Sequence, residues 1–179
     1  PDGLGRRVEL MAYLLDTNVF IDAKGRHYGM DFCPGFWEWL THASQAGTVA
    51  SITQVADELQ DDELNEWLPT LGREFFRQPD EKVLAAMAKV SAWANLQKYT
   101  AAAKSEFLAA ADYHLVAHAL ASGHVVVTHE QIEHSLARIK IPNVCIALGV
   151  QYLQTHVMLR RERVRLVWEG ASRTITGHA

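Results

Sequence analysis

Four carboxylates from distant stretches of the chain have types and positions that suit a metal-dependent reaction. They are Asp16, Glu58, Asp112 and Glu130. Asp16 ends a short apolar run, and Glu130 follows the apolar run Val125–Thr128 by two residues. Glu58 lies in a helical stretch after a second apolar run, and Asp112 opens the helix that leads into Val125–Thr128. Ligands of open α/β sheets gather outside the carboxyl ends of the strands, so we expect the four carboxylates to converge there.

The chemistry expected of such a cluster is hydrolysis by metal-activated water. Carboxylates that share a partly dry cleft repel one another, and a divalent cation offsets this cost. A ligand set of hard oxygens without His or Cys suits Mg²⁺ or Mn²⁺. Such an ion activates water for in-line attack and stabilises the leaving oxygen. The sequence therefore predicts that all four acids are metal ligands and catalytic residues.

Alternating strand and helix patterns are expected to position these acids. The predicted strands are residues 13–16, 48–52, 125–128 and 144–148. The predicted helices are residues 36–46, 54–61 capped by Thr53, 110–122 ended by Gly123, 131–139 broken by Pro142, and 150–159, with a helix-rich region at 63–97. This alternation predicts an α/β fold, a three-layer α/β/α sandwich with a mainly parallel sheet.

Length and composition favour one soluble domain. The 179 residues carry a formal charge of −4, and no apolar run reaches the roughly 20 residues of a membrane helix. Two separated cysteines are typical of a reduced, cytoplasmic protein. We interpret residues 1–10 as a leader or expression-derived segment, 11–160 as the domain, and 161–179 as a tail or a hairpin.

Four segments that carry the candidate acids have distinctive sequences: YLLDTNVFID at 13–22, SITQVADEL at 51–59, ADYHLVAHA at 111–119 and VVVTHE at 125–130. Together these segments resemble the PIN-domain nucleases, and more closely a bacterial branch related to VapC-type toxins. Their order and spacing fit the family between Tyr13 and Leu159. Further likeness comes from the aromatic stretch 28–39 and from IPNVC at 141–145.

The resemblance implies a Mg²⁺- or Mn²⁺-dependent endoribonuclease, with Asp16, Glu58, Asp112 and Glu130 as ligands in that order. It also implies supporting roles for Thr17, Asn18 and Thr128. A VapC-type relative is expected to be the toxin of a type II toxin–antitoxin pair. Its expected substrate is RNA and its expected partner is a cognate antitoxin, and the resemblance also allows a homodimer. The family's fourth acid is more often Asp, so Glu130 reaches further and its role is the least fixed.

Other interpretations stay open at this point. A non-catalytic PIN-like module for nucleic-acid binding or regulation is the main alternative. His114 and His118 share a helix face, and His129-Glu130 with His134 approaches a zinc motif, but its second His comes five positions on instead of four. A phosphatase with an aspartyl nucleophile is disfavoured because position 18 is Asn.

Two further sets of residues have both a binding and a packing interpretation. The first set is aromatic and would stack on bases or pack on a helix face: Phe32, Phe36, Trp37 and Trp39. The second set is basic and would contact an RNA backbone or solvate a helix end: Arg138, Lys140, Arg160, Arg161, Arg163 and Arg165.

Overall fold

The computed structural model describes residues 11–167, and this part of the chain folds around one five-stranded parallel sheet. Its strands are β1 (Tyr13–Leu15), β2 (Val49–Ile52), β3 (Phe76–Arg77), β4 (Val125–Val127) and β5 (Tyr152–Leu153). Their order across the sheet is β3-β2-β1-β4-β5, and every neighbouring pair is parallel. The predicted α/β class is confirmed.

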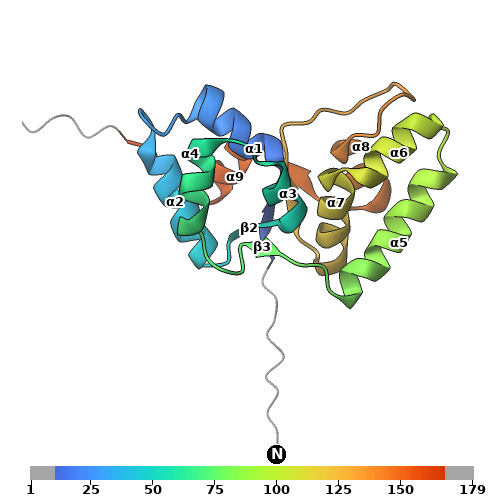
Figure 1. Cartoon of the computed structure of the whole chain (residues 1–179), viewed down its shortest axis with the longest axis horizontal. Coiled ribbons are helices and arrows are strands. Elements are labelled where there is room, and N and C mark those ends of the chain that lie inside the picture. Colours follow the sequence, from blue (N-terminus) through green and yellow to red (C-terminus); the bar gives the residue numbers. More distant parts are fainter. Residues whose placement is uncertain (1–10, 168–179) are drawn as a thin grey trace, which may run out of the picture.

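Helices cover both faces of the sheet, which completes a three-layer α/β/α sandwich (Figure 1). The helices are α1 (Thr17–Asp22), a π-helical turn η1 (Ala23–His27), α2 (Pro34–Gln45), α3 (Thr53–Glu58), α4 (Asp62–Trp67), a 3₁₀ turn η2 (Leu68–Thr70), α5 (Glu81–Leu96), α6 (Ala101–Ala109), α7 (Ala111–Ser122), α8 (Ile141–Leu148) and α9 (Thr155–Arg161). In Figure 1, α1, α2, α4 and α9 lie on one side, and α5 to α8 lie on the other.

The three central strands are buried along their whole length, as continuous apolar runs in a parallel sheet require. Leu14 of β1 aligns with Ala50 of β2 on one side and with Val126 of β4 on the other. Ser51 is the polar residue in this layer, and its hydroxyl donates a hydrogen bond of 2.6 Å to the carbonyl of Leu15. The buried hydroxyl is therefore satisfied within the sheet.

The order of strand addition reverses between β1 and β4, so that later strands lie on the opposite side of β1 from β2 and β3. The strands β2 and β3 extend the sheet to one side of β1, and β4 and β5 extend it to the other. Leu15 at the end of β1 aligns with Val127 at the end of β4. Asp16 and Thr128 therefore begin the loops at two adjacent carboxyl ends, the place where open α/β sheets bind ligands.

Side-chain caps define several helix starts. The caps whose side chains accept a backbone N–H are Asp16 for α1, Asp61 for α4, Asp80 for α5 and Thr100 for α6. The prediction that Thr53 caps the next helix is wrong, because Thr53 is already helical and its hydroxyl bonds Gln54 instead. Gly123 ends α7 as predicted, with a φ of 68° that glycine adopts without strain.

The segment after β4 differs most from the sequence-based expectation. Residues 131–139 were predicted to be helical, but they form an irregular loop. Hydrogen bonds between this loop and Asn143 hold it: Asn143 accepts from the Glu133 N–H at 3.0 Å and donates to the Glu133 carbonyl at 2.8 Å. The predicted strand 144–148 is the helix α8. Pro142 stands in the first turn of α8, where its missing N–H costs nothing, so it starts this helix and does not break one.

Two short strands were also missed. The two-residue strand β3 lies inside the region 63–97, which we expected to be helix-rich. Residues 150–159 were predicted to be one helix, but they contain β5 followed by the start of α9. Residues 168–179, which make up most of the segment interpreted as a tail or a hairpin, lie outside the described residues, as do residues 1–10.

Between residues 11 and 167, no helix combines the length and the apolar character needed to cross a membrane.

Candidate metal centre

Asp16 follows β1 directly and caps the first turn of α1. Its side chain is 3% exposed and accepts three hydrogen bonds, from the Thr17 N–H at 2.7 Å, the Asn18 amide at 2.6 Å and the Thr128 hydroxyl at 2.8 Å. Burial raises the pKa of Asp16 to about 7; the bonds from Thr128 and Thr17 oppose this rise, and the charges of Glu130 and Glu58 add to it. Asp16 is thus a buried carboxylate held in one orientation, and a nearby cation would stabilise its charged form.

Glu58 ends α3 and ties it to two other elements. Its Oε2 accepts a hydrogen bond of 2.6 Å from the Thr17 hydroxyl, and its Oε1 accepts one of 3.3 Å from the Ala111 N–H. Ala111 is the first residue of α7, so Glu58 lies at the positive end of that helix dipole. Glu58 and its neighbour Asp57 are both exposed, but the Asp57 carboxylate makes no hydrogen bond within residues 11–167. The geometry therefore selects Glu58 over Asp57 as the residue aimed at the cluster.

Asp112 lies in the first turn of α7 and has an unusual environment. No hydrogen bond or ion pair within the described chain reaches its carboxylate, although the residue is partly buried. Burial raises the pKa of Asp112 to about 8, and the charges of Asp16, Glu130 and Glu58 add to this rise while Lys140 opposes it. An unpaired carboxylate among three others is a costly arrangement unless a cation joins it.

Glu130 follows β4 and is held at the start of α8. Lys140 Nζ forms an ion pair with Glu130 Oε1, and the Ile141 N–H donates a hydrogen bond of 2.8 Å to Glu130 Oε2. The Glu130 N–H donates in turn to the Thr128 hydroxyl at 3.1 Å, and the side chain is 12% exposed. Both carboxylate oxygens of Glu130 therefore have partners that belong to the protein.

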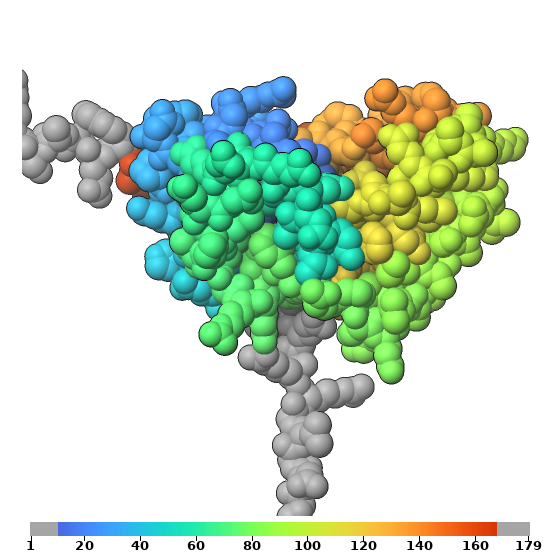
Figure 2. All heavy atoms as spheres, viewed as in Figure 1, coloured from blue at the N-terminus to red at the C-terminus, as the bar shows by residue number. Residues whose placement is uncertain are grey.

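The four predicted acids are thus brought together from four separate segments. They influence one another electrostatically, since Glu58 and Glu130 contribute to the raised pKa values of both Asp16 and Asp112. The three supporting residues named from the sequence, Thr17, Asn18 and Thr128, all bond directly to Asp16. From the front, the atoms of α3 and α7 meet where the teal and yellow regions of the surface adjoin (Figure 2).

The donor set fits a hard divalent cation. No group of three or more His, Cys, Asp or Glu side chains in residues 11–167 is already arranged to hold a metal ion. Mg²⁺ does not require such a cage, because it usually keeps several waters and binds through one or two carboxylates plus substrate phosphate. The unpaired Asp112 and the buried Asp16 are oxygen donors whose charged forms a cation would stabilise. Asp16 and Asp112 would hold the ion, with Glu58 and Glu130 beside them.

Two residues near the centre were not recognised from the sequence as belonging to it. Lys140 was placed in a basic set near a helix end, yet its ammonium lies among the acids. Asp22 was not singled out, yet its Oδ2 lies 2.8 Å from His129 Nδ1. Asp22 is the last residue of the six-residue helix α1, and this position brings its carboxylate to His129.

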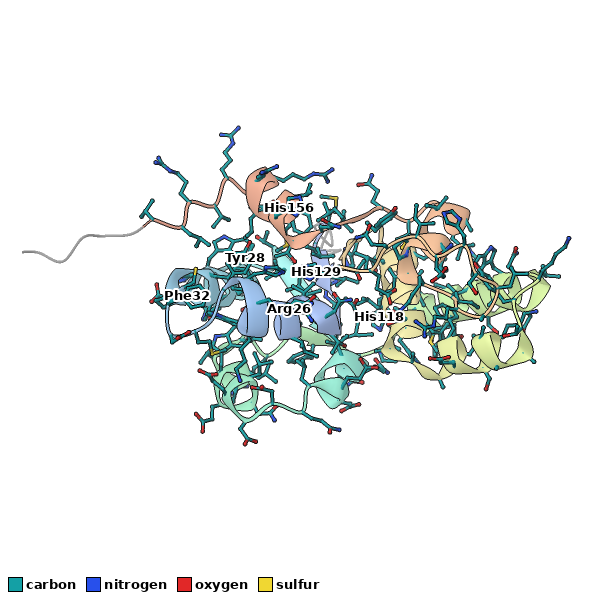
Figure 3. All side chains as sticks on the ribbon, turned by 90° about the horizontal axis from the view of Figure 1, so that it is seen from above. Arg26, Tyr28, Phe32, His118, His129 and His156 are labelled. Carbon is teal, nitrogen blue, oxygen red and sulfur yellow. The ribbon has the colours of Figure 1, made fainter. Side chains whose placement is uncertain are left out.

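His129 links three segments around the centre and does not form a zinc site. Its Nδ1 faces Asp22 at 2.8 Å, its Nε2 faces the Thr155 hydroxyl at 2.7 Å, and its N–H donates to Asn18 Oδ1 at 3.0 Å. Figure 3 shows His129 between α1 and the segment that carries His156. Both ring nitrogens are occupied and His134 is exposed in the loop, so the near-match to a zinc motif has no structural counterpart.

His114 and His118 share a face of α7 but are directed into the packing around it. His118 is 4% exposed, and its Nε2 has no hydrogen-bond partner among the described residues; the same holds for His114 Nδ1. Burial lowers the pKa of His118 to about 4, and the positive charges of Arg77, His114 and His124 lower it further while Asp80 opposes them. His118 is therefore a neutral core residue at neutral pH.

This burial predicts acid sensitivity. Because the pKa of His118 is about 4 in the folded chain and about 6.5 when unfolded, the unfolded state binds more protons between these values. The stability from neutral His118 is full above pH 6.5 and is lost as the pH falls through 4, a loss on the order of 3 kcal/mol. Urea titrations at pH 7 and 4.5 measure it. His118→Gln is expected to flatten the pH dependence, whereas the exposed-site control His156→Gln leaves it as in the parent; equal slopes for all three contradict the prediction.

The aromatic residues near α2 serve mostly as core. Phe36 and Trp37 are buried, and Phe36 stacks on Tyr28 with ring centroids 4.3 Å apart. Trp37 Nε1 donates a hydrogen bond of 2.6 Å to the Tyr28 carbonyl. Phe32 is different, since it is 68% exposed and projects from the surface (Figure 3). Packing therefore explains Phe36 and Trp37, and base stacking stays open for Phe32.

Comparison with known proteins yields one assignment. The sequence profile of the family described as a domain of unknown function, DUF4411, matches residues 13–166. No curated protein and no solved structure matches the chain. The matched range runs from β1 past α9 and contains all four carboxylates, all five strands and every helix of the described chain. The chain therefore belongs to the DUF4411 family.

Proposed function

We propose that this protein is a divalent-metal-dependent endoribonuclease whose centre consists of Asp16, Glu58, Asp112 and Glu130. The observation that carries the proposal is the state of Asp112, a partly buried carboxylate without a hydrogen-bond partner in the described chain and with a pKa of about 8 beside three other acids. Folding therefore places a destabilising negative charge at Asp112, and a cation bound at the site would stabilise that charge. The choice of RNA as substrate follows from the resemblance to PIN-domain nucleases described above.

The protein's own residues would act as holders and positioners. Asp16 is fixed by Thr17, Asn18 and Thr128, so its free lone pairs keep one direction. Asp112 has no competing donor within the described chain and would turn toward the ion. When bound, Mg²⁺ or Mn²⁺ supplies a water of lowered pKa and offsets negative charge on the phosphodiester. The Thr17 hydroxyl donates a hydrogen bond to Glu58, and this bond fixes the position of Glu58 relative to Asp16.

The direct test is RNA cleavage by the purified wild-type chain with Mg²⁺ or Mn²⁺ and with EDTA. We expect internal cleavage of a single-stranded RNA with metal and none with EDTA. Calorimetric titration with Mn²⁺ should show saturable binding at the same time. A chain that neither binds Mn²⁺ nor cleaves any RNA of a mixed-sequence pool would overturn the proposal.

We extend the proposal to a toxin of a type II toxin–antitoxin pair, located in the cytoplasm and neutralised by a cognate antitoxin protein. This extension rests on the VapC-type resemblance alone. Induced expression of the wild-type chain in a bacterial host should stop growth, and an adjacent reading frame that encodes a small DNA-binding protein should restore it. Growth unaffected by a folded, well-expressed chain contradicts the toxin role while leaving the nuclease role standing.

A second candidate function is a non-catalytic PIN-like module that binds nucleic acid or regulates a partner. One observation favours it: Glu130 is already neutralised by Lys140 and the Ile141 N–H, which removes one ligand from immediate use. Such a module binds RNA without cutting it and needs no metal at the acids. RNA binding that is unchanged by EDTA, together with no cleavage, would select this function over the nuclease.

A further inference from the structure

Lys140 is a loop residue whose side chain points back into the acid cluster. Its backbone precedes the first residue of α8, and its side chain turns back to the acid cluster, where Nζ pairs with Glu130 Oε1. The Lys140 side chain is 33% exposed, so one side of it still faces solvent. Its charge also lowers the otherwise raised pKa of Asp112, which places the ammonium within electrostatic reach of a second acid.

The ammonium of Lys140 brings a full positive charge into the acid cluster, because lysine is protonated at physiological pH. A positive charge inside a group of carboxylates does part of what a metal ion does, because it offsets their mutual repulsion.

The partners of the two Glu130 carboxylate oxygens differ in how easily they can be displaced. Oε2 is bound by the Ile141 N–H at 2.8 Å, a backbone donor at a helix start that cannot move without unwinding α8. Oε1 is bound by Lys140 Nζ, which lies at the end of a flexible, partly exposed four-carbon chain. Glu130 can therefore exchange the partner of one oxygen while the other oxygen keeps the carboxylate in place.

We propose that Lys140 is the resident cation of the acid cluster, pairing with Glu130 in the metal-free protein and leaving Glu130 Oε1 when a divalent metal binds. This inference rests on the proposed metal-dependent function and adds a regulatory element to it. A divalent ion held by Asp16 and Asp112 would repel the nearby ammonium, so metal binding would favour the departure of Lys140 from Glu130 Oε1. Lys140 then lowers metal affinity and sets the metal concentration at which the site fills.

Mn²⁺ calorimetry on two lysine variants tests the proposal. Lys140→Met keeps the aliphatic stem and removes the charge, and we expect it to bind Mn²⁺ roughly tenfold more tightly than the wild type. Lys24→Met is the matched control, because Lys24 also forms an ion pair, with Asp61 at 2.6 Å, and has no part in the pKa shifts of Asp16 or Asp112. Its Mn²⁺ affinity should equal that of the wild type.

A second measurement on the wild-type sequence covers the case in which Lys140→Met does not fold. Reductive ¹³C-methylation of the lysines gives each side chain an NMR signal, and Mg²⁺ addition should shift the Lys140 signal and leave that of Lys24 in place. Equal Mn²⁺ affinity in wild type and folded Lys140→Met, or a Lys140 signal unmoved at saturating Mg²⁺, overturns this inference alone if RNA is still cut. Absence of metal binding and of cleavage in every variant overturns the proposed function as well.

Discussion

Asp112→Asn is expected to reduce metal-dependent RNA cleavage by roughly a thousandfold, because it removes a charged metal ligand and leaves the shape of the side chain unchanged. Asp112 is the acid with no hydrogen bond inside the described chain, so its replacement breaks no structural contact there. Asp16→Asn should have a similar effect on cleavage. It also disturbs the bonds from Asn18 and Thr128, which makes Asp112 the cleaner position.

The control for this experiment is Asp57→Asn, next to Glu58 on α3. Asp57 is exposed and lies outside the cluster, so the same chemical change there should leave cleavage within about twofold of the wild type. Initial rates on one labelled RNA at saturating Mn²⁺, with circular dichroism to verify the fold, provide the comparison. Wild-type rates in folded Asp112→Asn would remove Asp112 from the mechanism.

The same substitution should stabilise the protein when metal is absent. The pKa of Asp112 is about 8 in the folded chain, compared with 3.8 for the ordinary side chain, so the folded state holds the proton more tightly than the unfolded state. The stability linked to this proton is full below pH 3.8 and is lost as the pH rises through 8. Asparagine never ionises, so Asp112→Asn should exceed the wild type at pH 8 by an amount on the order of 3 kcal/mol.

Urea unfolding in EDTA at pH 5 and pH 8 measures this gain. The difference between Asp112→Asn and wild type should grow with pH, and saturating Mn²⁺ should stabilise the wild type and not the variant. The favourable interaction of a charged Asp112 with the start of α7 opposes the gain by at most about 1 kcal/mol. A variant that is less stable than the wild type at pH 8 in EDTA contradicts the prediction and the view of Asp112 as an uncompensated charge.

The sequence was sufficient to predict where the residues of the candidate site that follow buried strands lie in the fold. Asp16 and Thr128 end apolar runs that are buried on both faces, and such runs are recognisable without a structure. Asp112 was placed correctly because α7 ends in glycine and leads straight into β4. In each case a local pattern determines where the side chain must lie.

The path from β4 to β5 was predicted wrongly, for a physical reason. Residues 131–139 have a helical sequence pattern, but Asn143 and Thr100 hold this loop through bonds to Glu133 and to the carbonyl of Leu136. Because the loop is irregular, α8 begins at Ile141 and Lys140 returns to Glu130. A helix over residues 131–139 would have carried Lys140 elsewhere. The position of the Lys140 side chain thus depends on long-range contacts that cannot be recognised from a local sequence pattern.

The two edges of the sheet restrict how another chain can join this fold. Each edge strand, β3 and β5, has only two residues in the ladder. Strand addition needs a longer row of free backbone donors and acceptors, so an incoming peptide would gain few hydrogen bonds at either edge. A second copy of the chain, or an inhibitory partner, is therefore expected to bind through helix faces and their side chains, with specificity carried by shape instead of by backbone pairing.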